Sequence, residues 1–128
     1  MQIIPQDSDR TVMIVDDELI VRTMMRFILE MSGYMIVAEA NDGVEAVAHY
    51  LELRPRITLM DISMPNKNGI DATREIVAID ANAKVVIISG INCQDLVKTA
   101  LEAGARDALS KPVKIKDLKE VLRRLMQT

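Results

Sequence analysis

Apolar residues gather in five short runs along the chain, and each run is bounded by polar or turn-forming residues. Four of the runs are rich in β-branched side chains, and the fifth, which follows Gly104, is weaker. Runs of this length and composition are typical of buried strands. The runs are "TVMIV" (11–15), "MIVAEA" (35–40), "ITLM" (57–60), "VVIIS" (85–89) and "RDALS" (106–110).

The segments between these runs predict helices. Residues 43–53 and 70–80 are two of them, and three others carry apolar stripes at helical spacing. Gly33 and Gly104 end the first two striped helices, and we expect each stripe to face the core. The stripes are Ile20, Met24, Phe27, Ile28 and Met31; Leu96, Val97, Ala100 and Leu101; and Ile115, Leu118, Val121, Leu122 and Leu125.

Strand and helix therefore alternate five times within one domain, residues 11–128. Strands that are apolar throughout, each followed by a helix, indicate a parallel sheet covered on both faces. Five units are too few for an eight-stranded barrel, so we predict an α/β fold with an open, doubly wound sheet. Residues 1–10 are mostly polar and contain Pro5, and we interpret them as a flexible lead-in.

The composition excludes several classes of function but does not identify the function itself. The net charge of −3 argues against nucleic-acid binding driven by bulk charge. No apolar run approaches the ~18 residues that a membrane span needs, and the first residues lack a signal-peptide pattern. The single cysteine, Cys93, excludes an intramolecular disulfide. We therefore expect a cytoplasmic protein that binds neither nucleic acid nor membrane directly.

Chemically active side chains follow the predicted strands. Asp16 and Asp17 come after the first strand, and Asp61 comes after the third. Ser89 ends the fourth strand, and Lys111 follows the fifth. Ligands of doubly wound sheets bind beyond the carboxyl ends of the strands, so we expect these side chains to meet. Taken singly, four of them have simpler explanations, because aspartates and serines cap helices or turns and most lysines are solvated. Asp61 is the exception, because a capping aspartate does not need so buried an approach.

Together these residues indicate phosphoryl chemistry. Three carboxylates at one edge of a sheet repel one another unless a cation lies among them. Mg²⁺ prefers such oxygen ligands, and its two charges, together with that of Lys111, balance the three aspartates. A carboxylate beside a metal ion, an ammonium group and a hydroxyl group has what the uptake of a phosphoryl group requires.

Four motifs, in this order and spacing, resemble the receiver domain of two-component response regulators of the chemotaxis-regulator type. They are "VDDE", "LMDISMPNKNG", "VIISG" and "GARDALSKP", and the resemblance covers residues 11 to about 126. It implies a flavodoxin-like sheet with the strand order 2-1-3-4-5. It also implies that Asp61 is the phosphoacceptor, that Lys111 contacts the phosphoryl oxygens, and that Ser89 is the switch hydroxyl.

The resemblance also implies a set of metal ligands. Asp17, Asp61 and the backbone carbonyl of Ser63 would bind Mg²⁺ directly, and Asp16 would hold it through water. The bond between Lys111 and Pro112 is usually cis in this family.

The resemblance implies that this protein is a signalling switch and not an enzyme. Such a domain nevertheless catalyses its own phosphoryl uptake and loss. The phosphodonor would be a sensor histidine kinase or a phosphotransfer protein. Phosphorylation would change the Ser89 loop and the surface of the fourth helix, fifth strand and fifth helix. This change would alter binding to a downstream effector protein or to an output domain absent from this chain. The oligomeric state would be a monomer or a phosphorylation-dependent dimer.

The chain departs from the family pattern at two aromatic positions. Ala108 lies where receivers carry an aromatic residue whose inward movement reports phosphorylation, and Val113 replaces the aromatic residue after the Lys-Pro pair. We hypothesise that phosphorylation nevertheless reorders residues 89–95.

Three other functions compete with a receiver. A magnesium-dependent phosphohydrolase of the haloacid-dehalogenase type needs a second acid two residues after the nucleophile, where this chain has Ser63. A pseudo-receiver that acts only by protein contact would have lost part of the acidic pocket. A nucleotide-binding sheet would show a glycine-rich loop after the first strand, and none is present. Arg22 and Arg26, four residues apart, are interpreted as a solvated helix face.

Overall fold

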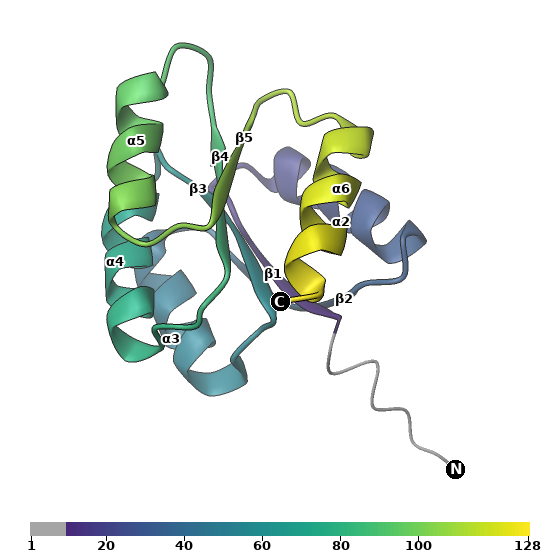
Figure 1. Ribbon diagram of the computed structural model, residues 1–128, viewed down its shortest axis with the longest axis horizontal. Coiled ribbons are helices and arrows are strands. Elements are labelled where there is room, and N and C mark those ends of the chain that lie inside the picture. The colour runs from purple at the N-terminus through teal and green to yellow at the C-terminus, as the bar shows by residue number, and fades with distance from the viewer. Residues whose placement is uncertain (1–9) are drawn as a thin grey trace.

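The computed structural model describes residues 10–128, in which strands and helices alternate along the chain (Figure 1). The predicted lead-in, residues 1–10, lies outside the described residues except for Arg10. The elements are β1 (Thr11–Val15), α2 (Leu19–Met31), β2 (Met35–Ala40), α3 (Gly43–Leu53), β3 (Ile57–Asp61), α4 (Gly69–Ile79), β4 (Val85–Ser89), α5 (Gln94–Glu102), β5 (Asp107–Ser110) and α6 (Ile115–Met126).

The strands form one parallel sheet in the order β2-β1-β3-β4-β5, which confirms the predicted strand order. The order reverses beside β1, so the carboxyl ends of β1 and β3 lie next to each other at the switch point. In register, Asp61 of β3 pairs with Ile88 of β4, and Ser89 pairs with Ser110 of β5. The sheet thus brings the predicted site residues together at the carboxyl ends of its strands.

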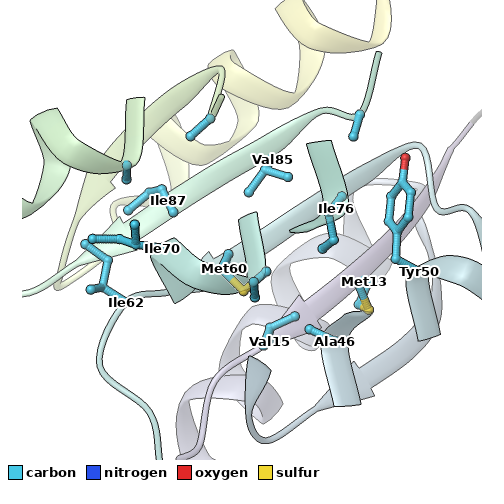
Figure 2. Packing of buried hydrophobic residues seen from close by; sticks show 14 of the residues in the cluster. Met13, Val15, Ala46, Tyr50, Met60, Ile62, Ile70, Ile76, Val85 and Ile87 are labelled. Carbon is cyan, nitrogen blue, oxygen red and sulfur yellow. The ribbon is translucent and has the colours of Figure 1, made fainter. Parts of the chain in front are cut away.

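Helices cover both faces of the sheet, with α3, α4 and α5 on one face and α2 and α6 on the other (Figure 1). Because successive strand residues point to opposite faces, each strand contributes to two cores. Met13, Met60 and Ile87 pack under α3 and α4 (Figure 2). The alternate strand residues, such as Ile14 and Leu59, pack under α2 and α6.

The predicted inner stripe of α2 is wrong in its orientation. Its side chains are exposed at Ile20, Met24, Phe27 and Met31, and only Ile28 is partly buried. The face that packs on the sheet instead carries Met25 and Leu29. α2 carries apolar side chains on two faces, and the sheet contacts the face of Met25 and Leu29 rather than the predicted stripe.

The predicted stripe of α6 faces the core for most of its length, whereas only half of the predicted stripe of α5 does. Along α6, Leu118, Val121, Leu122 and Leu125 are buried, whereas Ile115 is exposed. Along α5, Ala100 is buried and Val97 is half-buried, but Leu96 and Leu101 remain exposed.

Gly33 and Gly104 follow α2 and α5 with φ angles of +89° and +119°. Residues with side chains rarely adopt such angles, which explains why these helices end at the predicted glycines.

Within residues 10–128, no helix has the length and apolar character needed to cross a membrane.

Candidate functional site at the carboxyl edge of the sheet

Three aspartates meet at the carboxyl ends of β1 and β3. Asp16 and Asp61 are only 2% and 6% exposed, whereas Asp17 is exposed. One carboxylate oxygen from each lies within 4.8 Å of the others. The buried pair is held by the strands that precede it, and Asp17 faces solvent at the mouth of the site. The predicted acidic cluster is therefore present.

Lys111 lies between the two buried aspartates. Its Nζ atom is 3.0 Å from Oδ2 of Asp16 and 3.2 Å from Oδ1 of Asp61. The backbone N–H of Lys111 also donates a 2.7 Å hydrogen bond to the carbonyl of Ser89, which fixes the lysine beside the end of β4. The bond between Lys111 and Pro112 is cis, as predicted.

These charges change the proton affinities of the site. Burial raises the pKa of Asp61 to about 6, and the charge of Asp16 adds to this effect against the opposing charge of Lys111. Burial lowers the pKa of Lys111, but the hydrogen bond to Asp16 and the two nearby carboxylates outweigh burial and raise it overall. At neutral pH, Lys111 is thus a cation and Asp61 is mostly a carboxylate.

Close backbone contacts at two glycines, Gly43 and Gly69, hold the loop after β3 near Asp61. A Cβ atom on Gly69 would lie 1.9 Å from the carbonyl oxygen of Asp61, so only glycine fits there. The N–H of Gly69 donates to the carbonyl of Ile62, and the N–H of Gly43 donates to the carbonyl of Lys67. A Cβ on Gly43 would lie 2.5 Å from that same oxygen. The loop therefore lies in close backbone contact with the end of β3 at Gly69 and with the first residue of α3 at Gly43.

Side chains hold the same loop from α3. Asn66, at φ +67°, donates a 2.7 Å hydrogen bond from Nδ2 to Oδ2 of Asp42. The other oxygen of Asp42 caps α3 by accepting the N–H of Glu45. Both hydrogen bonds lower the pKa of the Asp42 carboxyl group. The sequence analysis identified this loop but not its hydrogen bond to Asp42, because Asp42 lies 24 residues before Asn66 in the chain.

Arg22 is a positioning residue that the sequence reading missed. It was interpreted as solvated, yet its side chain is only 15% exposed. Its Nη1 atom donates a 2.7 Å hydrogen bond to the carbonyl of Asp16, and its Nε atom is 3.0 Å from Glu39 of β2. Arg22 thus ties the end of β1 to α2 and β2. Its partner Glu39 is 17 residues away, so no local sequence signal marks the contact.

Ser89 is buried, 3% exposed, at the end of β4. Beside it lies a cavity of about 280 Å³ that Ala108 also lines. Cys93, which directly precedes α5, and Val97 within α5 also line this cavity. The methyl group of Ala108 thus leaves open the space between β5 and α5, next to the predicted switch hydroxyl.

The donor set fits a hard divalent cation. All three side chains are carboxylates, and two of them are buried with only one ammonium group to balance them. Mg²⁺ takes oxygen ligands of this kind and keeps several waters, which the exposed side of Asp17 permits. Among the described residues, no hydrogen-bond donor reaches the carbonyl of Ser63, the fourth predicted ligand.

Comparison with known proteins decides the family. The profile of the response regulator receiver domain matches residues 12–123 of the chain. This chain belongs to the receiver-domain family. It is 43% identical over 116 residues to the chemotaxis protein CheY of Thermotoga maritima, a match that covers 91% of this chain and 97% of that protein.

Solved receiver structures agree with the fold. A two-component response regulator of the LuxR family from Aurantimonas sp. is 35% identical, with a TM-score of 0.86 over 91% of this chain and 84% of that one. The CheX–CheY–BeF3–Mg²⁺ complex from Borrelia burgdorferi contains a chain that is 34% identical. Its TM-score is 0.81 over 91% of this chain and 87% of that one.

Family membership assigns a general function. Receiver domains are the phosphorylation-dependent signalling switches of two-component systems, and they bind Mg²⁺ through an acidic pocket. In this receiver, Asp16, Asp17 and Asp61 form an acidic cluster with the geometry to hold a metal ion.

Proposed function

We propose that this receiver domain takes up a phosphoryl group on Asp61, in a reaction that depends on Mg²⁺, and thereby regulates the binding of a partner protein. The observation that carries the proposal is the position of Asp61. Its carboxylate is nearly buried, 3.2 Å from the Lys111 ammonium group and within reach of both Asp16 and Asp17.

The reaction proceeds by nucleophilic attack. An oxygen of Asp61 attacks the phosphorus atom of a phosphohistidine, so that a P–O bond forms while the P–N bond breaks and its electron pair returns to the imidazole. Lys111 donates to the phosphoryl oxygens and compensates the charge that gathers on them. Asp17, Asp61 and the backbone carbonyl of Ser63 would hold Mg²⁺ directly and Asp16 would hold it through water, and the bound ion would supply the remaining positive charge.

Phosphorylation then acts on the loop after β4. The Ser89 hydroxyl donates to the new phosphoryl group, and residues 89–95 reorder with it. Ala108 cannot report this movement as an aromatic side chain would, so backbone movement next to the 280 Å³ cavity carries the signal to α5 and β5. The surface formed by α5, β5 and α6 is the part of the molecule that changes.

The partners are a sensor histidine kinase or phosphotransfer protein upstream and an effector protein or output domain downstream, in the cytoplasm. A similar chain in Borrelia burgdorferi is seen in a complex with CheX, BeF3 and Mg²⁺. That complex supports a protein partner and the binding of Mg²⁺ for the present chain.

The test of phosphoryl uptake uses acetyl phosphate and Mg²⁺, followed by intact mass measurement and peptide mapping. We expect one added phosphoryl group, on the peptide that contains Asp61. Asp61→Asn should take up none, and Asp117→Asn, at an exposed acid in the first turn of α6, should behave as the wild type. Equal uptake by Asp61→Asn, or no uptake at all, rejects the proposed site.

The switch is tested separately by amide chemical shifts. We expect shifts in residues 89–95 when Asp61 is phosphorylated, and smaller ones in Ser89→Ala. If Asp61 is modified while these amides do not move, phosphoryl uptake stands and the proposed switch is wrong.

A further inference from the structure

A pocket of about 500 Å³ lies at the amino-terminal ends of the strands, at the opposite edge of the sheet from Asp61. Three of its lining residues directly precede neighbouring strands: Arg56 comes before β3, Lys84 before β4 and Arg106 before β5. Because the strands are parallel, these basic side chains gather at one edge, as the aspartates do at the other. We call this cavity the amino-edge pocket.

Positive charge dominates the amino-edge pocket. Arg54 is its fourth cation, and within residues 10–128 Asp80 is the only acidic side chain that lines it. The two carboxylate oxygens of Asp80 already accept hydrogen bonds of 2.9 and 3.0 Å from the Tyr50 hydroxyl and the Asn82 N–H. Arg54 lies 3.8 Å from the same carboxylate. Four cations and one carboxylate leave a net side-chain charge of +3.

Lys84 is the buried cation of the pocket, with only 8% of its surface exposed. Its Nζ atom donates hydrogen bonds of 2.7 and 2.8 Å to the carbonyls of Leu125 and Thr128, at the end of α6. An ammonium group has three donors, so one is left for a ligand. Burial lowers the pKa of Lys84, and the charges of Arg56 and Arg106 lower it further. A bound anion would offset this repulsion.

Guanidinium groups line the same pocket as this ammonium group. Arg106 is exposed, and its side chain forms no hydrogen bond or ion pair with the rest of residues 10–128. Arg54 is also exposed and shares the engaged carboxylate of Asp80. A guanidinium group can donate two parallel hydrogen bonds to a phosphate, which makes arginine well suited to this kind of ligand.

The dimensions and charge of the pocket favour a small polyanion. Its volume lies within the range of roughly 300–1,000 Å³ that is typical of small-molecule sites. Two linked phosphoryl groups carry about three negative charges near neutral pH, which matches the net charge of the pocket. A nucleobase would find no aromatic face to stack on, because Tyr50 is 3% exposed and Arg54 lies over its ring. The phosphoryl groups are therefore the part that the pocket can recognise.

We propose that the amino-edge pocket binds a diphosphate group, either free or as part of a nucleotide, through Lys84, Arg54 and Arg106. The proposal does not depend on phosphoryl uptake, because no residue of the pocket belongs to the site at Asp61.

Isothermal titration calorimetry in buffer free of magnesium and phosphate tests the ligand class, with inorganic diphosphate, ADP and orthophosphate as probes. We expect one diphosphate per chain, and orthophosphate should bind at least about tenfold more weakly because it offers fewer charge-assisted hydrogen bonds. Binding of diphosphate alone supports the free ion as the ligand, and similar binding of ADP supports a nucleotide. Orthophosphate that binds as tightly as diphosphate, or no binding of either diphosphate or ADP, overturns the proposal.

Variants test the location of the site. Arg106→Gln and Lys84→Met should each weaken diphosphate binding at least about tenfold. Arg106→Gln is the decisive variant, because Lys84→Met also removes two hydrogen bonds to the end of α6. The matched control is Arg74→Gln, at an exposed arginine of α4 that is paired with Asp71 outside the pocket, and it should bind as the wild type does.

Amide chemical shifts provide a second measure of location. The amides of Lys84 and Arg106 should move during titration with diphosphate, and far-UV circular dichroism checks that the variants are folded. Unchanged affinity in Arg106→Gln, an equal loss in Arg74→Gln, or binding without movement of these two amides overturns the proposed site.

Discussion

At the scale of single residues, the site places two buried carboxyl groups beside a single ammonium group. Asp61 is nearly buried beside Asp16, and one ammonium group serves both carboxylates. The pKa of Asp61 is therefore raised from 3.8 to about 6. A carboxyl group with a raised pKa binds protons more tightly in the folded than in the unfolded chain. Stability should therefore fall as the pH rises from about 4 to about 6, and the full cost persists above that.

Asp61→Asn should remove this cost. In EDTA at pH 8, we expect the variant to be more stable than the wild type by roughly 1–3 kcal/mol, because two pKa units correspond to about 2.7 kcal/mol. Near pH 4 the difference should shrink toward zero, because the wild-type carboxyl is then mostly protonated in the folded chain. Urea unfolding at both pH values measures this. An Asp61→Asn variant without any gain at pH 8 would contradict the electrostatic description of the site.

The residues of the candidate site could be predicted from the sequence, because each lies at the end of a strand or directly after it. Asp16, Asp61 and Lys111 meet as expected. Arg22 could not be predicted, because its role depends on the carbonyl of Asp16 and on Glu39, which only the folded sheet brings to it.

At the scale of elements, the position of Asp61 depends on the close contact between the end of β3 and the start of α4. Gly69 begins α4 directly against the last residue of β3, and its N–H donates to the carbonyl of Ile62. Only the absence of a side chain allows this approach.

Gly69→Ala should therefore push the loop away from the strand. We expect a loss of roughly 2–4 kcal/mol in the free energy of unfolding, together with slower phosphoryl uptake, because a Cβ would overlap a backbone oxygen that cannot rotate aside. Thermal unfolding and uptake from acetyl phosphate measure the two effects. Gly90→Ala is the control, because its Cβ would meet only the sulfur of Cys93, at 3.9 Å. Similar losses in both variants would show that the contact at Gly69 is not the cause.

The orientation of α2 shows the limit of periodicity. A pattern of apolar residues predicts that a helix has an apolar face, but α2 has two such faces. Met25 and Leu29 belong to the buried cluster that also contains residues of β1, β3 and α6. Nothing local to residues 19–31 encodes that choice.

At the scale of the whole molecule, the acidic cluster that we propose as a metal site joins segments from the first and the middle part of the chain. Asp17 follows β1 and Asp61 ends β3, so a bound cation stabilises only the folded arrangement.

Mg²⁺ should therefore raise the thermal stability of the receiver relative to EDTA. At a concentration about 100 times its dissociation constant, the gain should be about 2.7 kcal/mol. Asp17→Asn should lose most of it, and Asp117→Asn should keep it. The gain should also decrease below about pH 6, where Asp61 binds a proton in place of the metal. A gain that is independent of pH and of Asp17 would place the metal elsewhere.

The sequence alone determined the alternation of strands and helices, the glycine stops at residues 33 and 104, and the residues at the strand ends. These features are local, because they follow from side-chain volume, backbone freedom and the chain order of the motifs. The tertiary structure decided which face of α2 is buried, how Arg22 holds Asp16, and how closely Gly69 approaches Asp61. Each of these depends on surfaces that come from distant segments, and they exist only once the sheet has formed.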